Sequence, residues 1–256
     1  MGTENILSSS VLMGFLLTMA RVSSVFVFVP VPGLKSAVDP ARILLMMGVS
    51  VALFPVWPRV PAETPPGLLA VWILSEAALG VGIGLAVAFA VEAFSVGAQL
   101  IGMQAGYSFA STIDPSTQAD STVLIVLAQT SAAVLFFVMG LDREILRIFA
   151  RSMQTYPPGS FVLTRGAAET VLLAGSTMFS TGLRLALPII AVMVMVDISL
   201  ALLGRVNSQL QLLSIAFPIK MMVAVGLLAW LSMLLPTLLR GGSEFTFRAA
   251  RALAVR

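Results

Sequence analysis

The stretch from Leu68 to Leu100, LLAVWILSEAALGVGIGLAVAFAVEAFSVGAQL, decides the class of this protein. It is longer than the roughly 20 apolar residues that a helix needs to cross a bilayer, and it contains only two charged residues, both glutamates. Gly80, Gly84 and Ala88 recur every four residues, so they share one helix face and let a second helix approach closely. The stretch therefore predicts a membrane helix that packs tightly against another helix.

The composition of the whole chain agrees with this. Of the 256 residues, 58% are hydrophobic and 11% are charged, and the mean hydropathy is +1.01. A soluble domain carries about a quarter charged residues. We therefore expect an all-α integral membrane protein, organised as a single membrane domain over residues 1–256.

Six regions have the length and polarity expected of membrane helices. Stretches rich in proline separate the first three of them, because proline cannot continue a helix. The regions are 6–29, 43–57, 68–100, 123–141, 174–203 and 212–239, within a hydrophobic part that covers 11–240.

The longest polar connection covers residues 142–169 and opens with DREILRIFARSM. Arg143, Arg147 and Arg151 alternate with apolar residues at helical spacing. This pattern predicts an amphipathic helix with a basic face, of the kind that lies at a membrane surface.

Lysines and arginines are distributed unevenly among the connections. With six spans, nine fall on the side of the two termini, the 58–67 loop, the 142–169 connection and the basic tail 240–256, and three fall on the other side. An excess of basic residues marks the cytoplasmic side, so both termini are predicted to be cytoplasmic. Residues 1–10 lack a basic region, so the first apolar run is expected to remain as a span and not to be removed as a signal peptide.

Several function classes are excluded by what the sequence lacks. It contains neither cysteine nor histidine, which removes disulfides, zinc and haem sites and the usual general base. It shows no phosphate-binding or metalloprotease motif. The net charge of +3 comes without a basic cluster interleaved with aromatic residues, so nucleic acid is not an expected ligand. We expect no enzyme activity, no cofactor and no metal.

Six ionisable residues fall within predicted spans. Each costs a few kcal/mol at the bilayer centre, so each should face protein, water or a partner unless it lies near a span end and reaches the surface. We expect these charges to act in assembly, with partners on this chain or on another. They are Arg21, Glu76, Glu92, Arg184, Asp197 and Lys220.

Charges inside spans also fit an ion-coupled transporter of a small solute, which remains the alternative. Such transporters usually carry broken helices at matching positions in two halves. Here Pro188 and Pro218 both lie in the C-terminal half.

The stretch IGMQAGYSFASTIDPSTQADST, residues 101–122, combines small residues with bulky apolar ones and carries only two charges. Non-helical backbone at membrane depth is tolerated only where it is buried in protein or lines a cavity. A loop that fills a pore would have this composition, and so would an ordinary re-entrant or extramembrane loop. The residues alone leave both interpretations open.

Four stretches of the chain carry a family pattern. They are GMQAGYSFASTIDPST (102–117), LLTMARVSSVFVFVPVPG (16–33), LALPIIAVMVMVDISLALLGRVNSQL (185–210) and IAFPIKMMVAVGLLAWL (215–231). Together they resemble the FliR family, the flagellar biosynthesis export-gate proteins with SctT counterparts in injectisomes. One position departs from the family pattern: Ser208 stands where the family often has proline, so the turn that follows the fifth region is expected to differ in detail.

The resemblance implies a structural and gating subunit of the type III protein export gate in the bacterial inner membrane, at the flagellar base. In that family, one such chain assembles with five FliP-like and four FliQ-like subunits, and a FlhB-like subunit wraps the entrance. The helices form tilted hairpins within this helical assembly, and unfolded polypeptides pass through its channel. The matches are closer to the flagellar branch than to the injectisome branch.

The resemblance also assigns a pore plug loop, which favours the pore-filling interpretation. The implied plug residues are Gly102, Met103, Gln104, Ala105, Gly106, Tyr107, Ser108, Phe109, Ala110, Ser111, Thr112, Ile113, Asp114 and Pro115.

Overall fold

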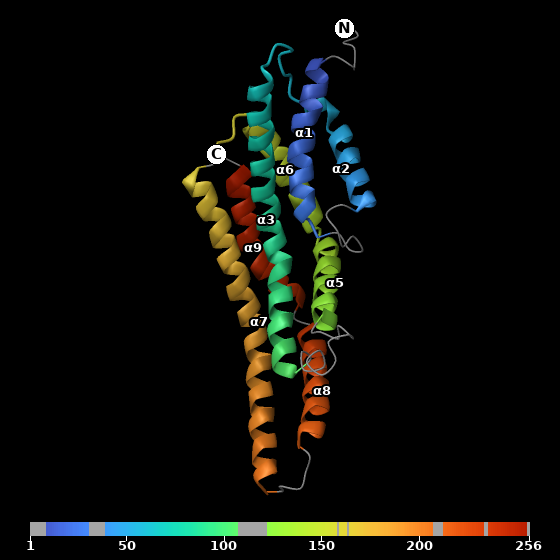
Figure 1. Ribbon diagram of the computed structural model, residues 1–256, viewed down its shortest axis with the longest axis vertical. Helices are drawn as coiled ribbons and strands as arrows, with labels where there is room; N and C mark the ends of the chain where they lie inside the picture. The colour runs from blue at the N-terminus through green and yellow to red at the C-terminus, as the bar shows by residue number, and fades with distance from the viewer. Residues whose placement is uncertain are drawn as a thin grey trace. The chain divides into compact units, whose positions relative to one another are not determined.

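The computed structural model describes residues 9–30, 39–106, 122–157, 159–162, 164–206, 212–232 and 235–254. All the regular elements in these ranges are helices, and Figure 1 labels the α-helices. In chain order they are α1 (Ser9–Phe28), α2 (Pro40–Ala52), the short 3-10 helix η1 (Phe54–Val56), α3 (Pro66–Ala105), α5 (Thr122–Val138), α6 (Leu141–Thr155), α7 (Arg165–Val206), α8 (Leu212–Ser232) and α9 (Leu235–Ala254).

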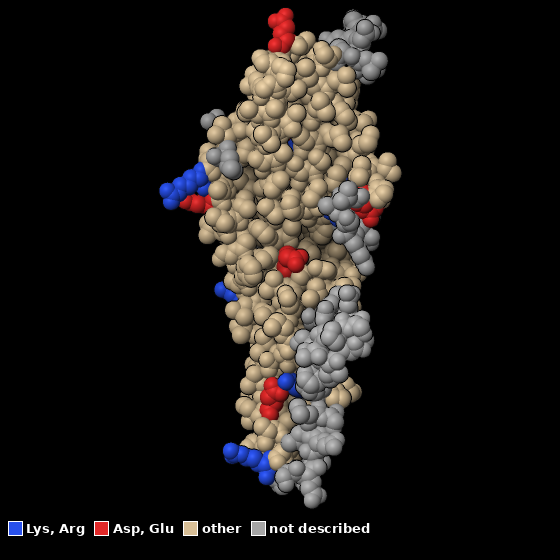
Figure 2. All heavy atoms as spheres, viewed as in Figure 1, with Lys and Arg blue, Asp and Glu red and all other residues tan. Residues whose placement is uncertain are grey.

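The described helices confirm the all-helical membrane class. Three of them, α1, α3 and α7, are long and apolar enough to cross a membrane, and a fourth span is added if α5 and α6 count as one broken helix pair. Pro40–Ala52 and Pro218–Ala229 are shorter apolar helices. Charged side chains are accordingly sparse in the space-filling view, separated by broad uncharged surface (Figure 2).

Proline explains why α2 falls short of the predicted span over 43–57. The helix begins at Pro40, where Asp39 caps its N-terminus by accepting a hydrogen bond from the Ala41 N–H over 3.1 Å. It ends at Ala52 and gives way to the short helix η1, which contains Pro55. The apolar stretch is therefore divided into two short helices.

The chain forms two compact units, and each boundary between them falls inside a helix. The first unit comprises Met1–Phe89, Phe137–Gly175 and Ser243–Arg256. The second comprises Ala90–Phe136 and Ser176–Gly242.

In the first unit, α1 packs directly on the glycine face of α3. A β-carbon added at Gly80 would lie 2.7 Å from the Arg21 carbonyl oxygen, and one added at Gly84 would lie 2.8 Å from the Val25 carbonyl oxygen. No side chain fits at such distances. The small-residue spacing of α3 therefore has its packing partner within the chain, in α1.

One buried ion pair joins three helices of the first unit. Arg21 on α1 and Glu76 on α3 are 0% and 1% exposed, and the Arg21 Nε donates to a Glu76 carboxylate oxygen. Arg21 also donates to the Tyr156 carbonyl oxygen over 3.0 Å and, at 3.5 Å, approaches the hydroxyl of Ser152 on α6. Each charge is thus compensated where water cannot reach it.

The same carboxylate holds the connection between α6 and α7. The N–H of Gly159 donates to Glu76 over 3.1 Å. Gly159 has a φ of +77°, and a β-carbon there would lie 2.4 Å from the ring of Trp72 on α3. Only glycine satisfies both conditions, because a side chain would be strained by the backbone angle and would collide with the indole.

In the second unit, α3 and α7 run parallel and in close contact. A β-carbon at Gly182 would lie 2.8 Å from the Ala93 carbonyl oxygen, and one at Gly97 would lie 3.2 Å from the Gly182 carbonyl oxygen. Further along both helices, a buried apolar cluster adds a residue of α8. Its members are Ile101, Ala105, Ala186, Ile189, Met193 and Ala224.

We predict opposite effects for two glycine-to-alanine substitutions. Gly80→Ala should destabilise the protein by about 1–3 kcal/mol, because the methyl group collides with α1 backbone. Gly48→Ala on α2 meets nothing within 4 Å, and should be neutral or stabilising by up to about 1 kcal/mol because alanine favours the helix. Thermal unfolding of the detergent-solubilised chain measures both, and equal effects would contradict the tight α1–α3 contact.

Removing one member of the Arg21–Glu76 pair should be far more damaging than removing an exposed pair. Glu76→Ala leaves a buried, uncompensated guanidinium and should cost about 3–5 kcal/mol. The matched control is Glu169→Ala, which breaks the exposed pair between Arg165 and Glu169 on α7 and should change little. The level of folded protein in membranes and its unfolding temperature would report the difference, and wild-type stability of Glu76→Ala would refute the buried pair.

Candidate gate and assembly sites

The predicted plug begins inside a helix. Because α3 runs to Ala105, residues 102–105 form its last turn, beyond the expected helix end at Leu100. Gly106 follows with a φ of +83°, and its N–H donates to the Met103 carbonyl oxygen over 3.2 Å. This left-handed glycine is a common way to end an α-helix.

The described plug residues divide between core and surface. Gly102 and Ala105 are buried, whereas the Met103 side chain is 60% exposed. The remaining plug residues lie outside the described residues: Tyr107, Ser108, Phe109, Ala110, Ser111, Thr112, Ile113, Asp114 and Pro115.

A polar cluster in the second unit ties the end of α3 to α7 and α8. The Gln104 side-chain amide donates to Asp197 over 3.1 Å, and the Lys220 ammonium lies 2.7 Å from the other oxygen of the same carboxylate. The side chains of Lys220 and Asp197 are 14% and 40% exposed. The two charges therefore neutralise each other within the chain, next to the residue where α3 ends.

Two of the six ionisable residues in the predicted spans lie on the surface of the chain. Glu92 on α3 and Arg184 on α7 are both exposed, although each lies in the middle of a long apolar helix. Neither forms an ion pair with another residue in the described ranges. Exposed surface on such helices is where lipid or another subunit would lie.

The structure thus resolves which charges meet. It joins Arg21 to Glu76 and Asp197 to Lys220, and it leaves Glu92 and Arg184 on the surface. The sequence spacing already showed that Asp197 and Arg184 are too far apart on one helix to pair directly.

Sequence reasoning missed two polar contacts. Arg42 on α2 donates to the carbonyl oxygens of Phe26 and Val27 in the last turn of α1, where a cation is favoured by the helix dipole. The resemblance assigns Gln104 to the plug and does not indicate its contact with Asp197. No signal in a single sequence indicates these long-range partners. The sequence does indicate where α2 begins, because Asp39-Pro40 is a typical pattern for a helix start.

The described part of the chain offers no obvious metal site. No group of three or more carboxylates is close enough to hold an ion there.

Known proteins resemble this chain over most of its length. The family model described as "Bacterial export proteins, family 1" matches residues 12–244, which include both paired clusters. The flagellar biosynthetic protein FliR of Escherichia coli (strain K12) is 29% identical over 201 residues, 77% of each chain. FliR of Pectobacterium carotovorum subsp. carotovorum is 31% identical over 198 residues, 76% of each chain.

A further relative matches a larger share of this chain. The surface presentation of antigens protein SpaR of Salmonella typhimurium is 26% identical over 224 residues, 86% of this chain and 81% of SpaR. The family model covers nearly the whole chain, and these relatives agree with it. The protein therefore belongs to family 1 of the bacterial export proteins.

Proposed function

We propose that this chain is a structural and gating subunit of the type III protein export gate at the flagellar base, in the bacterial inner membrane. The observation that carries this proposal is the family match over residues 12–244, together with the FliR relatives. The apolar helices of the chain support a place in the membrane. The subunit performs no bond chemistry, and unfolded flagellar polypeptides pass through a channel that it helps to build.

The proposed assembly contains other membrane proteins. Five FliP-like and four FliQ-like subunits surround one copy of this chain, and a FlhB-like subunit lies at the entrance. Both termini are on the cytoplasmic side, as the distribution of lysine and arginine suggests.

Within this gate, residues 102–115 form the plug. The composition of the segment and its resemblance to the family's plug support this assignment. The glycine that ends α3 and the exposed Met103 beside it mark the point where the proposed plug leaves the helix.

The charged clusters of the chain take two roles in this proposal. The Asp197–Lys220 pair, with Gln104, holds the end of α3 in place within the chain. Glu92 and Arg184 meet opposite charges on neighbouring subunits, since an unpaired charge in contact with lipid would cost a few kcal/mol.

The proposed gate is tested by purifying the tagged chain from membranes in mild detergent. We expect two smaller membrane proteins to copurify with it in a defined ratio, and we expect the purified chain alone to transport no small solute into liposomes. Recovery of the chain without partners, combined with solute uptake, would contradict the proposal and favour an ion-coupled transporter.

Shortening the proposed plug should open the resting channel. Deletion of residues 106–116 removes the bulky apolar side chains, so ion leakage across the inner membrane should rise in cells that contain the complete gate. The measurement is membrane conductance or ion efflux, with recovery of the intact complex as the control. Unchanged leakage from a fully assembled complex would count against a plug.

A charge exchange separates a partner inside the chain from one on another subunit. Asp197→Lys and Lys220→Asp each replace this pair, whose charged atoms lie 2.7 Å apart, by two like charges and should sharply reduce recovery of the complex. The double variant restores opposite charges and should recover most of it. If the double variant recovers no more complex than the single ones, Asp197 has its essential partner elsewhere.

Neutralising an exposed helix charge should affect assembly and not the fold of the chain. Arg184→Gln should lower recovery of the complex several-fold while the unfolding temperature of the isolated chain stays unchanged, because Arg184 makes no ion pair among the described residues. Arg165→Gln, on the same helix and 93% exposed, is the control that should leave recovery intact. Equal recovery of both variants would exclude a contact at Arg184.

A further inference from the structure

In the first unit, α6 and the part of α9 that belongs to this unit bury apolar side chains in protein. On α6, Ile145, Ile148 and Phe149 are each 1% exposed, and on α9, Phe247 and Leu253 are at most 6% exposed. The sequence predicts that α6 lies on a membrane through its apolar face, whereas the structure uses that face for packing within the chain. The basic face of α6 is therefore turned outward and needs a separate explanation.

Three arginines from α6 and α9 surround a shallow pocket of about 250 Å³. Arg147 and Arg151 lie one turn apart on α6, and Arg251 comes from α9. Glu144 and Ile148 complete the lining.

The single carboxylate of this pocket orients the arginines without neutralising them. Arg251 contacts one Glu144 oxygen through Nη2 at 2.8 Å and Nε at 3.1 Å, and Arg147 lies 3.4 Å from the other oxygen. Arg151 forms no ion pair with any described residue. Three positive side chains against one negative side chain leave two positive charges in excess around the pocket.

The shape and charge of this group match a phosphate. A guanidinium presents a planar fork of N–H donors, which binds phosphate oxygens in pairs, and arginine is the residue most often used for that purpose. Helices that follow an apolar segment and carry outward arginines meet such groups at the surface of anionic membranes. Here α6 begins three residues after the apolar helix α5 ends.

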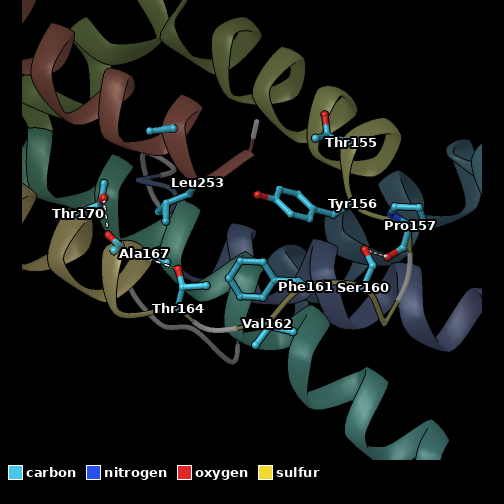
Figure 3. A pocket seen from close by; sticks show the side chains of 12 residues that line it. Thr155, Tyr156, Pro157, Ser160, Phe161, Val162, Thr164, Ala167, Thr170 and Leu253 are labelled. Atoms are coloured by element: carbon cyan, nitrogen blue, oxygen red, sulfur yellow. Dashed lines mark hydrogen bonds between the residues drawn. The ribbon is translucent and has the colours of Figure 1, made fainter. Parts of the chain in front are cut away.

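A second cavity indicates which kind of molecule would carry the phosphate. This cavity has a volume of about 410 Å³ and lies in the same unit. Its lining includes Thr155, one turn beyond Arg151 on α6. It also includes Ala252 and Leu253, which directly follow Arg251 on α9. Figure 3 shows the rings of Tyr156 and Phe161 facing this space, with the tyrosine hydroxyl directed toward the side of Leu253. An aromatic ring with a polar end is characteristic of the membrane–water boundary.

We propose that Arg147, Arg151 and Arg251 bind the phosphate of an anionic phospholipid, whose glycerol and first acyl carbons enter the cavity beside Tyr156. The basic pocket supplies the charge contacts. The cavity, which is lined by the ends of α6 and α9, the α6–α7 connection and the first turns of α7, supplies space for the less polar part of the molecule. This binding site is independent of the proposed gating function. It concerns lipid recognition by the first unit and would exist whether or not the plug closes a pore.

The test compares the full-length chain with two single variants of equal charge change. Arg151→Gln removes a pocket arginine without touching the contacts of Glu144. Arg143→Gln removes an exposed arginine of the same helix that does not line the pocket. Each protein, in non-ionic detergent, is mixed with equal amounts of phosphatidylglycerol and phosphatidylcholine, and the lipid that remains bound is counted by native mass spectrometry.

We expect the wild type and Arg143→Gln to retain phosphatidylglycerol in preference to phosphatidylcholine, and Arg151→Gln to retain about fivefold less phosphatidylglycerol. Addition of inorganic phosphate should displace part of the phosphatidylglycerol from the wild type, because both occupy the same arginines. Similar retention by the two variants, or no preference for phosphatidylglycerol in the wild type, would overturn the proposal.

Two further outcomes would identify a different ligand and thereby overturn the proposed lipid. One is thermal stabilisation by inorganic phosphate of the wild type and Arg143→Gln, but not of Arg151→Gln, without any preference for phosphatidylglycerol. The other is binding of a glutamate-rich peptide with the same dependence on Arg151. The first would indicate a soluble phosphate compound, and the second an acidic protein segment.

Discussion

Arg21 and Glu76 face each other where no solvent reaches, at the point where α1, α3 and α6 of the first unit meet. Neither charge is tolerable alone in such a place, because the cost of desolvating an ion is offset only by a close opposite charge and by additional hydrogen bonds. The close approach of α1 at Gly80 brings the two side chains together, and the Tyr156 carbonyl and the Gly159 N–H complete their hydrogen bonds. The path of the connection after α6 therefore follows from one ion pair.

The need of a charge for an opposite charge or for solvent also explains where the other charged residues of the apolar helices lie. Asp197 finds Lys220 and Gln104 within the second unit, while Glu92 and Arg184 remain on the surface of their helices. In the proposed assembly, internal pairs hold the chain together and exposed charges meet neighbouring subunits. The arginines of α6 and α9 outnumber the single carboxylate between them. In the proposed lipid site, their excess positive charge binds the phosphate of the lipid.

Much of this organisation could be predicted from the residues. The apolar stretch around Gly80 and Gly84 correctly predicted a helix with a tightly packed partner, and DREILRIFARSM correctly predicted an amphipathic helix. The ends of the helices were harder to predict from the sequence. For example, α3 continues to Ala105 through small residues that are compatible with either a helix or a loop. The partner of each charge could not be predicted, since contacts such as Arg21 with Glu76 join residues far apart in the chain and depend on packing that no local pattern encodes.

We propose that ion pairs within the chain stabilise it, while its exposed helix charges recognise other subunits. The decisive measurement is a density map of the complete assembly, purified from membranes. We expect Arg21 and Glu76 to remain paired within the chain, and Glu92 and Arg184 each to lie within about 4 Å of an opposite charge on a neighbouring polypeptide. A map in which Glu92 and Arg184 both face lipid, or in which Arg21 pairs with another subunit, would contradict it.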